Sequence, residues 1–147
     1  MKTVLAYPSY HDIEKGCARL VYQLATMDDE SQVIIGLSRG GLIPAVIMSH
    51  IMDLPMIPVA YSSTSGNGDD LNHENHLIAV KEHNVLIVDD ICDSGKTMAE
   101  VAAHYTAAGH IVTTAALYVK ESSVIMPNEY WQCIPSDAPW IIFPWEL

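Results

Sequence analysis

Residues 85–98 read Val85-Leu86-Ile87-Val88-Asp89-Asp90-Ile91-Cys92-Asp93-Ser94-Gly95-Lys96-Thr97-Met98. Four apolar residues run directly into two carboxylates, which predicts a buried strand that carries Asp89 and Asp90 to its carboxyl end. A third acid, Asp93, opens a turn of small residues, and a helix is expected to begin at Lys96. Backbone N–H groups in front of a helix bind phosphate, while acids bind sugar hydroxyls or a metal ion. The stretch therefore predicts a sugar-phosphate site.

Three other interpretations of this stretch explain it less well. A nucleotide-triphosphate loop also ends in Gly-Lys-Thr, but it needs a glycine five positions before Gly95, where this chain has Asp90. A receiver domain also contains a strand that ends in paired acids, but that strand opens the domain, and too little chain follows Val85 for the rest of its sheet. A purely structural strand, turn and helix would not require three acids within five positions, since neighbouring carboxylates repel each other.

Length and composition favour one α/β domain over residues 1–147. Half of the residues are apolar, and no apolar run approaches the ~20 residues that a membrane span needs. The first eight residues, Met1 to Pro8, are too short and too quickly polar for a secretory signal. The three cysteines show neither a zinc pattern nor a disulfide framework, which favours the reducing cytoplasm. The lack of a long apolar run favours no membrane insertion.

The formal net charge of −11 argues against a general nucleic-acid-binding protein, because such proteins neutralise phosphates with lysine and arginine. An acidic protein that binds a polyphosphate needs a divalent cation and a few well-placed basic residues. The chain has only seven lysines and arginines, so each one beside a motif carries weight.

Apolar periodicity predicts alternating strands and helices, hence a mostly parallel sheet with helices on both faces. The expected helices cover residues 9–26, 42–52 and 96–108, and the expected strands cover 33–37, 56–61, 85–88 and 111–119. The core thus ends near residue 120. Residues 62–76 are polar and glycine-bearing, which predicts a mobile lid loop. Residues 121–147 hold four of the eight prolines and all three tryptophans, and predict a small irregular hood without a further strand–helix unit.

Two other groups follow predicted strands, where ligands of open parallel sheets bind. In Ser38-Arg39-Gly40-Gly41 the glycine pair permits close backbone approach, and the Arg39 guanidinium suits diphosphate oxygens. Lys120 ends the strand 111–119, and Trp140 lies in the hood. Core packing alone would explain a hood tryptophan, but the preceding lysine favours a ligand-binding role.

On these motifs, and in their order, the chain resembles the type I phosphoribosyltransferases over nearly its whole length. Residues 93–98, Asp-x-Gly-Lys-Thr-Met, are similar to the purine salvage branch, and Ser38 to Pro44 resemble the bacterial xanthine-guanine enzymes. The resemblance implies that the ribose 5-phosphate is bound by Asp89, Asp90, Asp93, Ser94, Gly95, Lys96 and Thr97. It also implies that Asp93 is the general base near the purine N7.

The same resemblance assigns the other subsites. It implies that Ser38, Arg39 and Gly40 bind pyrophosphate, with a cis peptide at Ser38–Arg39. Lys120 would donate to the C6 oxygen of a purine, Trp140 would stack on the base, and the Ile141 backbone would read its C2 side. Asp90 and Glu146 would bind Mg²⁺, although the family usually has aspartate at the second position.

The implied reaction is Mg²⁺-dependent transfer of a phosphoribosyl group from phosphoribosyl diphosphate to guanine, xanthine or hypoxanthine, by a homo-oligomer, either dimer or tetramer. Two alternatives stay open. One is a regulator on this fold that senses phosphoribosyl diphosphate and binds RNA or DNA. The other is transfer to adenine or a pyrimidine. The start of the predicted lid differs from the family. The family usually has a Ser-Tyr pair there, whereas this chain has Tyr61-Ser62-Ser63, so the pair is inverted or absent. His73 and His76 are interpreted as loop histidines rather than metal ligands.

Overall fold

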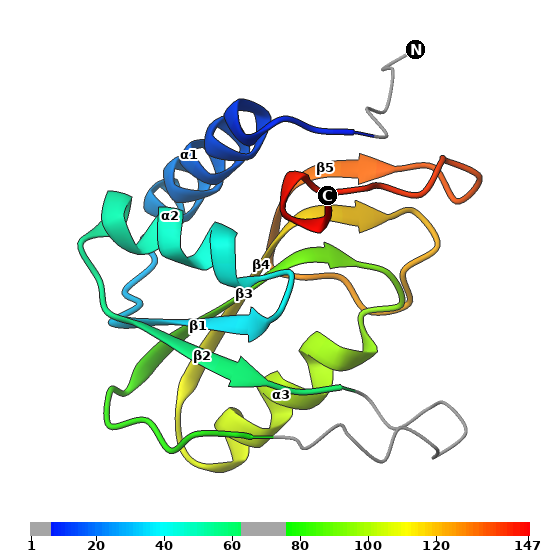
Figure 1. Cartoon of the computed structure of the whole chain (residues 1–147). Coiled ribbons are helices and arrows are strands. Elements are labelled where there is room, and N and C mark those ends of the chain that lie inside the picture. The colour runs from blue at the N-terminus through cyan, green and yellow to red at the C-terminus, as the bar shows by residue number, and fades with distance from the viewer. Residues whose placement is uncertain (1–6, 63–75) are drawn as a thin grey trace.

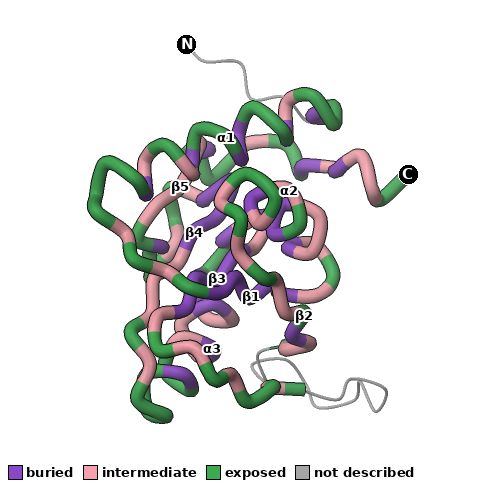
Figure 2. Tube along the Cα trace, turned by 90° about the vertical axis from the view of Figure 1, so that its left-hand side faces the viewer, coloured by how far each residue is buried: buried purple, intermediate pink, exposed green. Residues whose placement is uncertain are grey.

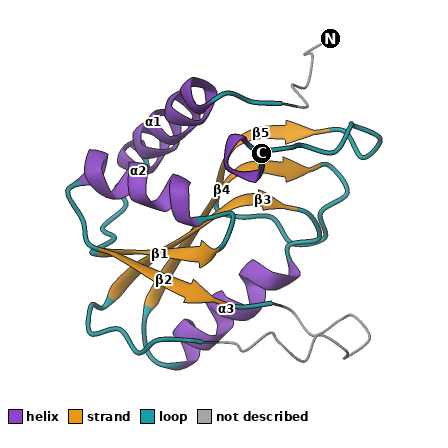
Figure 3. Cartoon of the chain, viewed as in Figure 1, coloured by secondary structure: helices purple, strands orange, loops and turns teal. Residues whose placement is uncertain are grey.

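The computed structural model describes residues 7–62 and 76–147, where five parallel strands form one sheet in the order β2-β1-β3-β4-β5. Helices α1 and α2 cover one face of this sheet and α3 covers the other (Figure 1, Figure 3). The elements are α1 Tyr10–Thr26, β1 Val33–Ser38, α2 Leu42–Met52, β2 Met56–Ala60, β3 Asn84–Cys92, α3 Lys96–Ala107, β4 Ile111–Lys120, β5 Glu129–Ile134 and the 3₁₀ turn η1 Pro144–Glu146.

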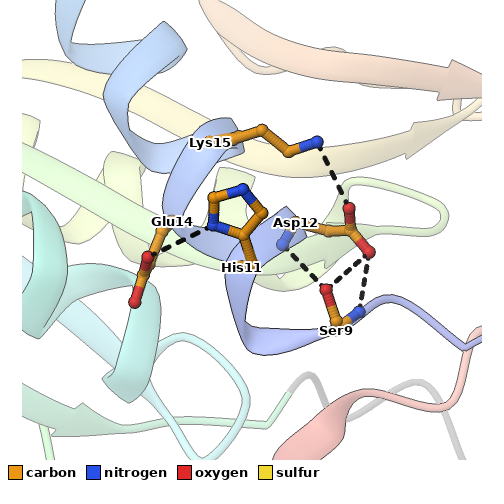
Figure 4. A network of polar contacts seen from close by, with 5 residues as sticks. All are labelled: Ser9, His11, Asp12, Glu14 and Lys15. Atoms are coloured by element: carbon orange, nitrogen blue, oxygen red, sulfur yellow. Dashed lines mark hydrogen bonds and ion pairs between the residues drawn. The ribbon is translucent and has the colours of Figure 1, made fainter.

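The predicted α/β class and the three helices are confirmed, with boundaries within a residue or two. Local chemistry explains the start of α1 (Figure 4): the backbone N–H of Asp12 donates to Ser9 Oγ at 3.1 Å, and the N–H of Ser9 donates to Asp12 Oδ2 at 2.8 Å. This reciprocal capping box satisfies two backbone donors that would otherwise lack a helical partner. No helix in residues 7–62 or 76–147 is long and apolar enough to cross a membrane.

Two strand predictions are corrected by the structure. Strand β3 does not end at Val88 but continues to Cys92, because residues 89, 91 and 92 stay in register with β4. The hood contributes β5, which the sequence did not predict. Strand β5 mixes polar and apolar residues and follows β4 without an intervening helix, so no local sequence pattern marks it as a strand. It forms because it pairs with β4 and contacts α1.

The core has two layers, one on each face of the sheet. Buried residues are concentrated in the central strands (Figure 2). The layer under α1 and α2 includes Ile141 and Phe143 from the hood, and the other layer packs against α3. Close packing sets α1 against β5, since a side chain at Gly16 would overlap the Trp131 ring and Leu117. All five strands are parallel, so the residues that follow β1, β3 and β4 meet at one edge of the sheet.

Candidate active site

The loop after β1 packs directly against the acids of β3. A Cβ atom at Gly40 would overlap the carboxylate of Asp90, and one at Gly41 would approach the carbonyl oxygens of Val88 and Leu37 to 2.5 and 2.8 Å. Only glycine therefore lets these two segments come together here. The peptide bond between Ser38 and Arg39 is cis, which confirms that prediction.

The paired acids Asp89 and Asp90 lie within the last few residues of β3, which ends at Cys92. Asp90 is only 9% exposed, and its backbone N–H donates to Asp89 Oδ1 at 2.8 Å. Burial, followed by the charge of Asp90, raises the pKa of Asp89 well above its ordinary value. Burial also raises the pKa of Asp90, and the charge of Glu146 adds to this effect. The site therefore holds negative charge at a cost in stability that a bound cation would offset.

A cavity of about 470 Å³ separates the loop after β1 from the C-terminal turn η1. Its lining residues are Arg39, Gly40, Asp90, Trp145 and Glu146. Oxygen ligands from Asp90 and Glu146 suit Mg²⁺, which proteins commonly bind through one or two carboxylates together with substrate phosphates. No group of three or more possible metal ligands occurs among the described residues. Trp145 also lines this cavity, and sequence reasoning missed it. Only the folding of the hood brings Trp145 next to Asp90 and Arg39.

We expect Asp90→Asn to raise the melting temperature at neutral pH in the absence of divalent cations. The raised pKa means that the folded state loses stability as pH rises from the unfolded value near 3.8 through the folded value, and asparagine removes this loss. The gain should be about 2–4 °C for each kcal/mol relieved, and should vanish in strong acid, where the wild-type carboxyl is protonated. Thermal unfolding followed across pH measures this. Asp93→Asn is the matched control, because the Asp93 side chain is 60% exposed, and an equal gain there would contradict the assignment.

The segment from Asp93 to Thr97 consists of a turn, residues 93–95, and the first two residues of α3. Gly95 has φ of 87°, and as the N-cap residue of α3 it offers no side chain to the N–H groups of the first turn. The Ser94 hydroxyl accepts from the Lys96 N–H at 3.2 Å. Such a turn is suited to binding a phosphate, because its amides and the helix dipole point at the same anion.

The connection between β4 and β5 forms hydrogen bonds with this segment. The carbonyl oxygen of Ser94 accepts from the N–H groups of Val124 at 3.1 Å and Ile125 at 3.2 Å. A Cβ atom at Gly95 would overlap the Ile125 carbonyl oxygen. Sequence reasoning missed this support, since Val124 and Ile125 lie about thirty residues away and carry no polar side chain.

The end of β4 brings Lys120 to Asp93. The Lys120 Nζ atom lies 3.1 Å from Asp93 Oδ1 and 5.2 Å from the centroid of the Trp140 ring. Trp140 is 65% exposed, so its ring is not buried in the core. The Ile141 side chain is 3% exposed and packs in the core, which leaves its backbone as the part that could contact a ligand. The structure thus brings together an acid, a cation and an exposed aromatic ring beside the phosphate-type loop.

The described residues include every candidate site residue, and these form one continuous edge. Gly40 of the loop after β1 packs against Asp90, the 93–97 segment follows β3, and Lys120 lies between Asp93 and Trp140. The predicted lid lies almost wholly outside the described residues, as does His73. Of its ends, His76 donates its backbone N–H to the Ala60 carbonyl oxygen at 2.7 Å.

Known proteins are similar to this chain both in sequence and in structure. The family described as "Phosphoribosyl transferase domain" matches residues 6–147. A xanthine-guanine phosphoribosyltransferase of Cereibacter sphaeroides is 30% identical over 148 aligned residues, which cover 95% of this chain and 85% of that protein.

Two solved structures superpose over 96% of this chain and 93% of their own chains. A purine phosphoribosyltransferase from Pyrococcus horikoshii is 31% identical, with a TM-score of 0.78. The xanthine-guanine-hypoxanthine phosphoribosyltransferase of Helicobacter pylori is 26% identical, with a TM-score of 0.79. The chain therefore belongs to the phosphoribosyl transferase domain family and is an enzyme of that family.

Proposed function

We propose that this enzyme transfers the phosphoribosyl group of phosphoribosyl diphosphate to a 6-oxopurine, with Mg²⁺, and releases pyrophosphate. The observation that carries the proposal is the pairing of Lys120 with Asp93 beside the exposed ring of Trp140. A 6-oxopurine presents the C6 oxygen next to N7, so one base edge could meet both charged groups. The names of the relatives from Cereibacter, Pyrococcus and Helicobacter support a purine base as acceptor.

In the proposed reaction most of the site residues bind the substrates, and one of them, Asp93, takes up a proton. The C1–oxygen bond to diphosphate breaks, and a C1–nitrogen bond to the purine forms. Asp89 and Asp90 accept hydrogen bonds from the ribose hydroxyls, and the 94–97 loop binds the 5′-phosphate through its N–H groups. Arg39, with Ser38 and Gly40, binds the diphosphate that leaves, and the proton lost by the base goes to Asp93. Mg²⁺ held by Asp90 and Glu146 would supply charge neutralisation of the diphosphate.

Most of the rate gain should come from holding two reactants in line and from fixed charges around the leaving group. Trp140 and Lys120 orient the base while the acids and the loop orient the sugar. The hood and the lid would exclude water, which would otherwise hydrolyse the activated sugar.

Rates of nucleotide formation from guanine, xanthine, hypoxanthine and adenine test the proposal, each measured with Mg²⁺ and again with a chelator. We expect turnover with at least one 6-oxopurine, its loss on chelation, and little turnover with adenine. Binding of phosphoribosyl diphosphate without turnover of any base would point instead to the regulator, and a titration with RNA and DNA at low salt would then examine that role.

Lys120→Met should lower the rate with 6-oxopurines by about ten- to a hundredfold, because it removes a charged hydrogen bond to the C6 oxygen that is worth roughly 1.5–3 kcal/mol. Affinity for phosphoribosyl diphosphate, measured by calorimetry without base, should change little. Lys81→Met removes an exposed cation before β3, at the opposite end of the sheet, and serves as control. Unchanged oxopurine rates in Lys120→Met would contradict the assigned role.

Other properties belong to the same proposal. We propose a single phosphoribosyltransferase domain over residues 1–147, and an enzyme that acts as a homo-oligomer in the cytoplasm. The unpaired state of all three cysteines, Cys17, Cys92 and Cys133, supports a reducing compartment. The charge of −11 disfavours nucleic acid as a partner.

A further inference from the structure

The connection between β4 and β5 contains a small hydrogen-bond network around Ser123, a half-buried residue. The Ser123 hydroxyl donates to the Ile125 carbonyl oxygen at 2.8 Å. The thiol of Cys92, the last residue of β3, lies 3.5 Å from both Ser123 Oγ and the Ile125 carbonyl oxygen. Two side chains from different segments therefore hold the same carbonyl group.

The Ile125 carbonyl oxygen that this network holds is also in close contact with the turn before α3. A Cβ atom at Gly95 would overlap it, so the two backbones touch there. The N–H groups of Val124 and Ile125 donate to the Ser94 carbonyl oxygen at 3.1 and 3.2 Å. Hydrogen bonds on one side and steric contact on the other fix the distance between Ile125 and the turn. The position of Ile125 therefore determines the position of the turn.

The same stretch of chain begins with Lys120, whose Nζ atom lies 3.1 Å from Asp93 Oδ1. The stretch therefore meets the turn twice, through the Lys120 ammonium group at its start and through two backbone amides at its end. Ser123 lies between these contacts and bonds toward both. Its N–H donates to the Lys120 carbonyl oxygen at 2.9 Å, and its hydroxyl donates to the Ile125 carbonyl oxygen. Ser123 thus fixes the spacing between Lys120 and the phosphate-type turn.

The far end of the connection is fixed separately, and its middle is held weakly by packing. The N–H of Thr114 in β4 donates to Asn128 Oδ1 at 2.8 Å, and the N–H of Asn128 donates to Thr114 Oγ1 at 2.9 Å. Between these ends, Val124 is 86% exposed, and Ile125 and Met126 are each 46% exposed. Side chains this exposed gain little from burial. Hydrogen bonds therefore do most of the work of ordering this segment.

We propose that Ser123 is a positioning residue, which holds the turn of residues 93–95 at a fixed distance from Lys120 so that a sugar phosphate and a purine meet in line. The role rests on the proposed function, because it requires the turn to bind the 5′-phosphate. The hydroxyl group is needed, since alanine would leave the Ile125 carbonyl oxygen with only the weaker thiol donor of Cys92. A displacement of about 1 Å between reactants is enough to lower a rate strongly.

Calorimetric affinity for ribose 5-phosphate, together with steady-state rates, tests the role. Ser123→Ala should weaken ribose 5-phosphate binding by about five- to twentyfold, the usual effect of losing a hydrogen bond. It should also lower kcat by about tenfold and leave the KM for the purine within about twofold. Ser123→Thr keeps the hydroxyl and should restore both values. Ser122→Ala is the matched control, because it removes an exposed hydroxyl from the neighbouring position. Circular dichroism establishes that each variant is folded.

Amide hydrogen exchange followed by NMR examines the same network without turnover. The N–H groups of Val124 and Ile125 should exchange slowly in the wild type, although Val124 is 86% exposed, because they donate to Ser94. Ribose 5-phosphate should slow both further, and this measurement needs no variant. In Ser123→Ala both amides should exchange at least about tenfold faster. The N–H of Thr114, which donates to a different side chain, should keep its rate.

The role of Ser123 is overturned if Ser123→Ala binds ribose 5-phosphate as the wild type does, or if Ser123→Thr loses as much affinity as Ser123→Ala. Fast exchange of both amides in the wild type, or exchange that ribose 5-phosphate leaves unchanged, would also overturn it. A wild-type enzyme that binds no ribose 5-phosphate would overturn the proposed phosphate subsite, and the role of Ser123 with it. The two failures are therefore distinguishable by the wild-type titration.

Discussion

Asp93→Asn should lower kcat by about 10²–10⁴ while changing the affinity for phosphoribosyl diphosphate by no more than a few fold. A positioned general base contributes a rate factor of roughly this size, and asparagine cannot accept the proton from the base. The fold should survive, since the Asp93 side chain is 60% exposed and exposed ion pairs such as the one with Lys120 contribute little to stability.

Steady-state rates with a 6-oxopurine, together with calorimetric binding of phosphoribosyl diphosphate, measure the two quantities separately. Asp137→Asn is the control, because it makes the same change of charge at an exposed acid of the hood that is not among the candidate site residues. Near-normal kcat in Asp93→Asn would mean that the proton leaves by another route. An equal loss of affinity for phosphoribosyl diphosphate would place Asp93 in sugar binding alone.

Gly95→Ala should abolish measurable transfer and weaken binding of phosphoribosyl diphosphate by at least a hundredfold. Two causes act together. Gly95 has φ of 87°, a conformation that costs other residues about 1–2 kcal/mol, and the new methyl group would overlap the Ile125 carbonyl oxygen. Relief of that overlap requires the loop to move, and its N–H groups would then no longer converge on the phosphate.

Gly109→Ala separates these two causes. Gly109 has φ of 97°, but a Cβ atom there meets nothing within 4 Å. The control should therefore lose about 1–2 kcal/mol of unfolding free energy and keep its activity. Chemical denaturation and initial rates measure both variants. Equal loss of activity in the two would show that backbone strain, rather than contact with Ile125, is responsible, and retained activity in Gly95→Ala would remove this loop from phosphate binding.

Local sequence was informative wherever function depends on residues close together in the chain. Three acids within five positions, followed by Gly95 and a helix start, predicted a phosphate-type loop at a strand end, and the structure has a strand, turn and helix there. The Ser38–Gly41 loop was likewise predicted to follow a strand, and its glycines are now explained by contact with Asp90 and Val88.

Prediction was weakest where the reason for a structure lies far away in sequence. Strand β5 has no local pattern that marks it, and it is defined by pairing with β4. The extension of β3 to Cys92 depends on the length of β4 beside it. Trp145 and Ile125 carry no signal of their own, because their roles depend on which residues, distant in sequence, they lie beside in the fold.

The sequence by itself determined the α/β class, the order of the motifs and the chemical type of each site residue, because periodicity, turn glycines and clustered acids act within a few positions. Only the tertiary structure decided that Lys120 lies 3.1 Å from Asp93, that Asp90 shares a cavity with Glu146, and that Trp140 stays 65% exposed. These are contacts and exposures between segments far apart in the chain, and they are set by how the strands pair and how the helices pack on the sheet.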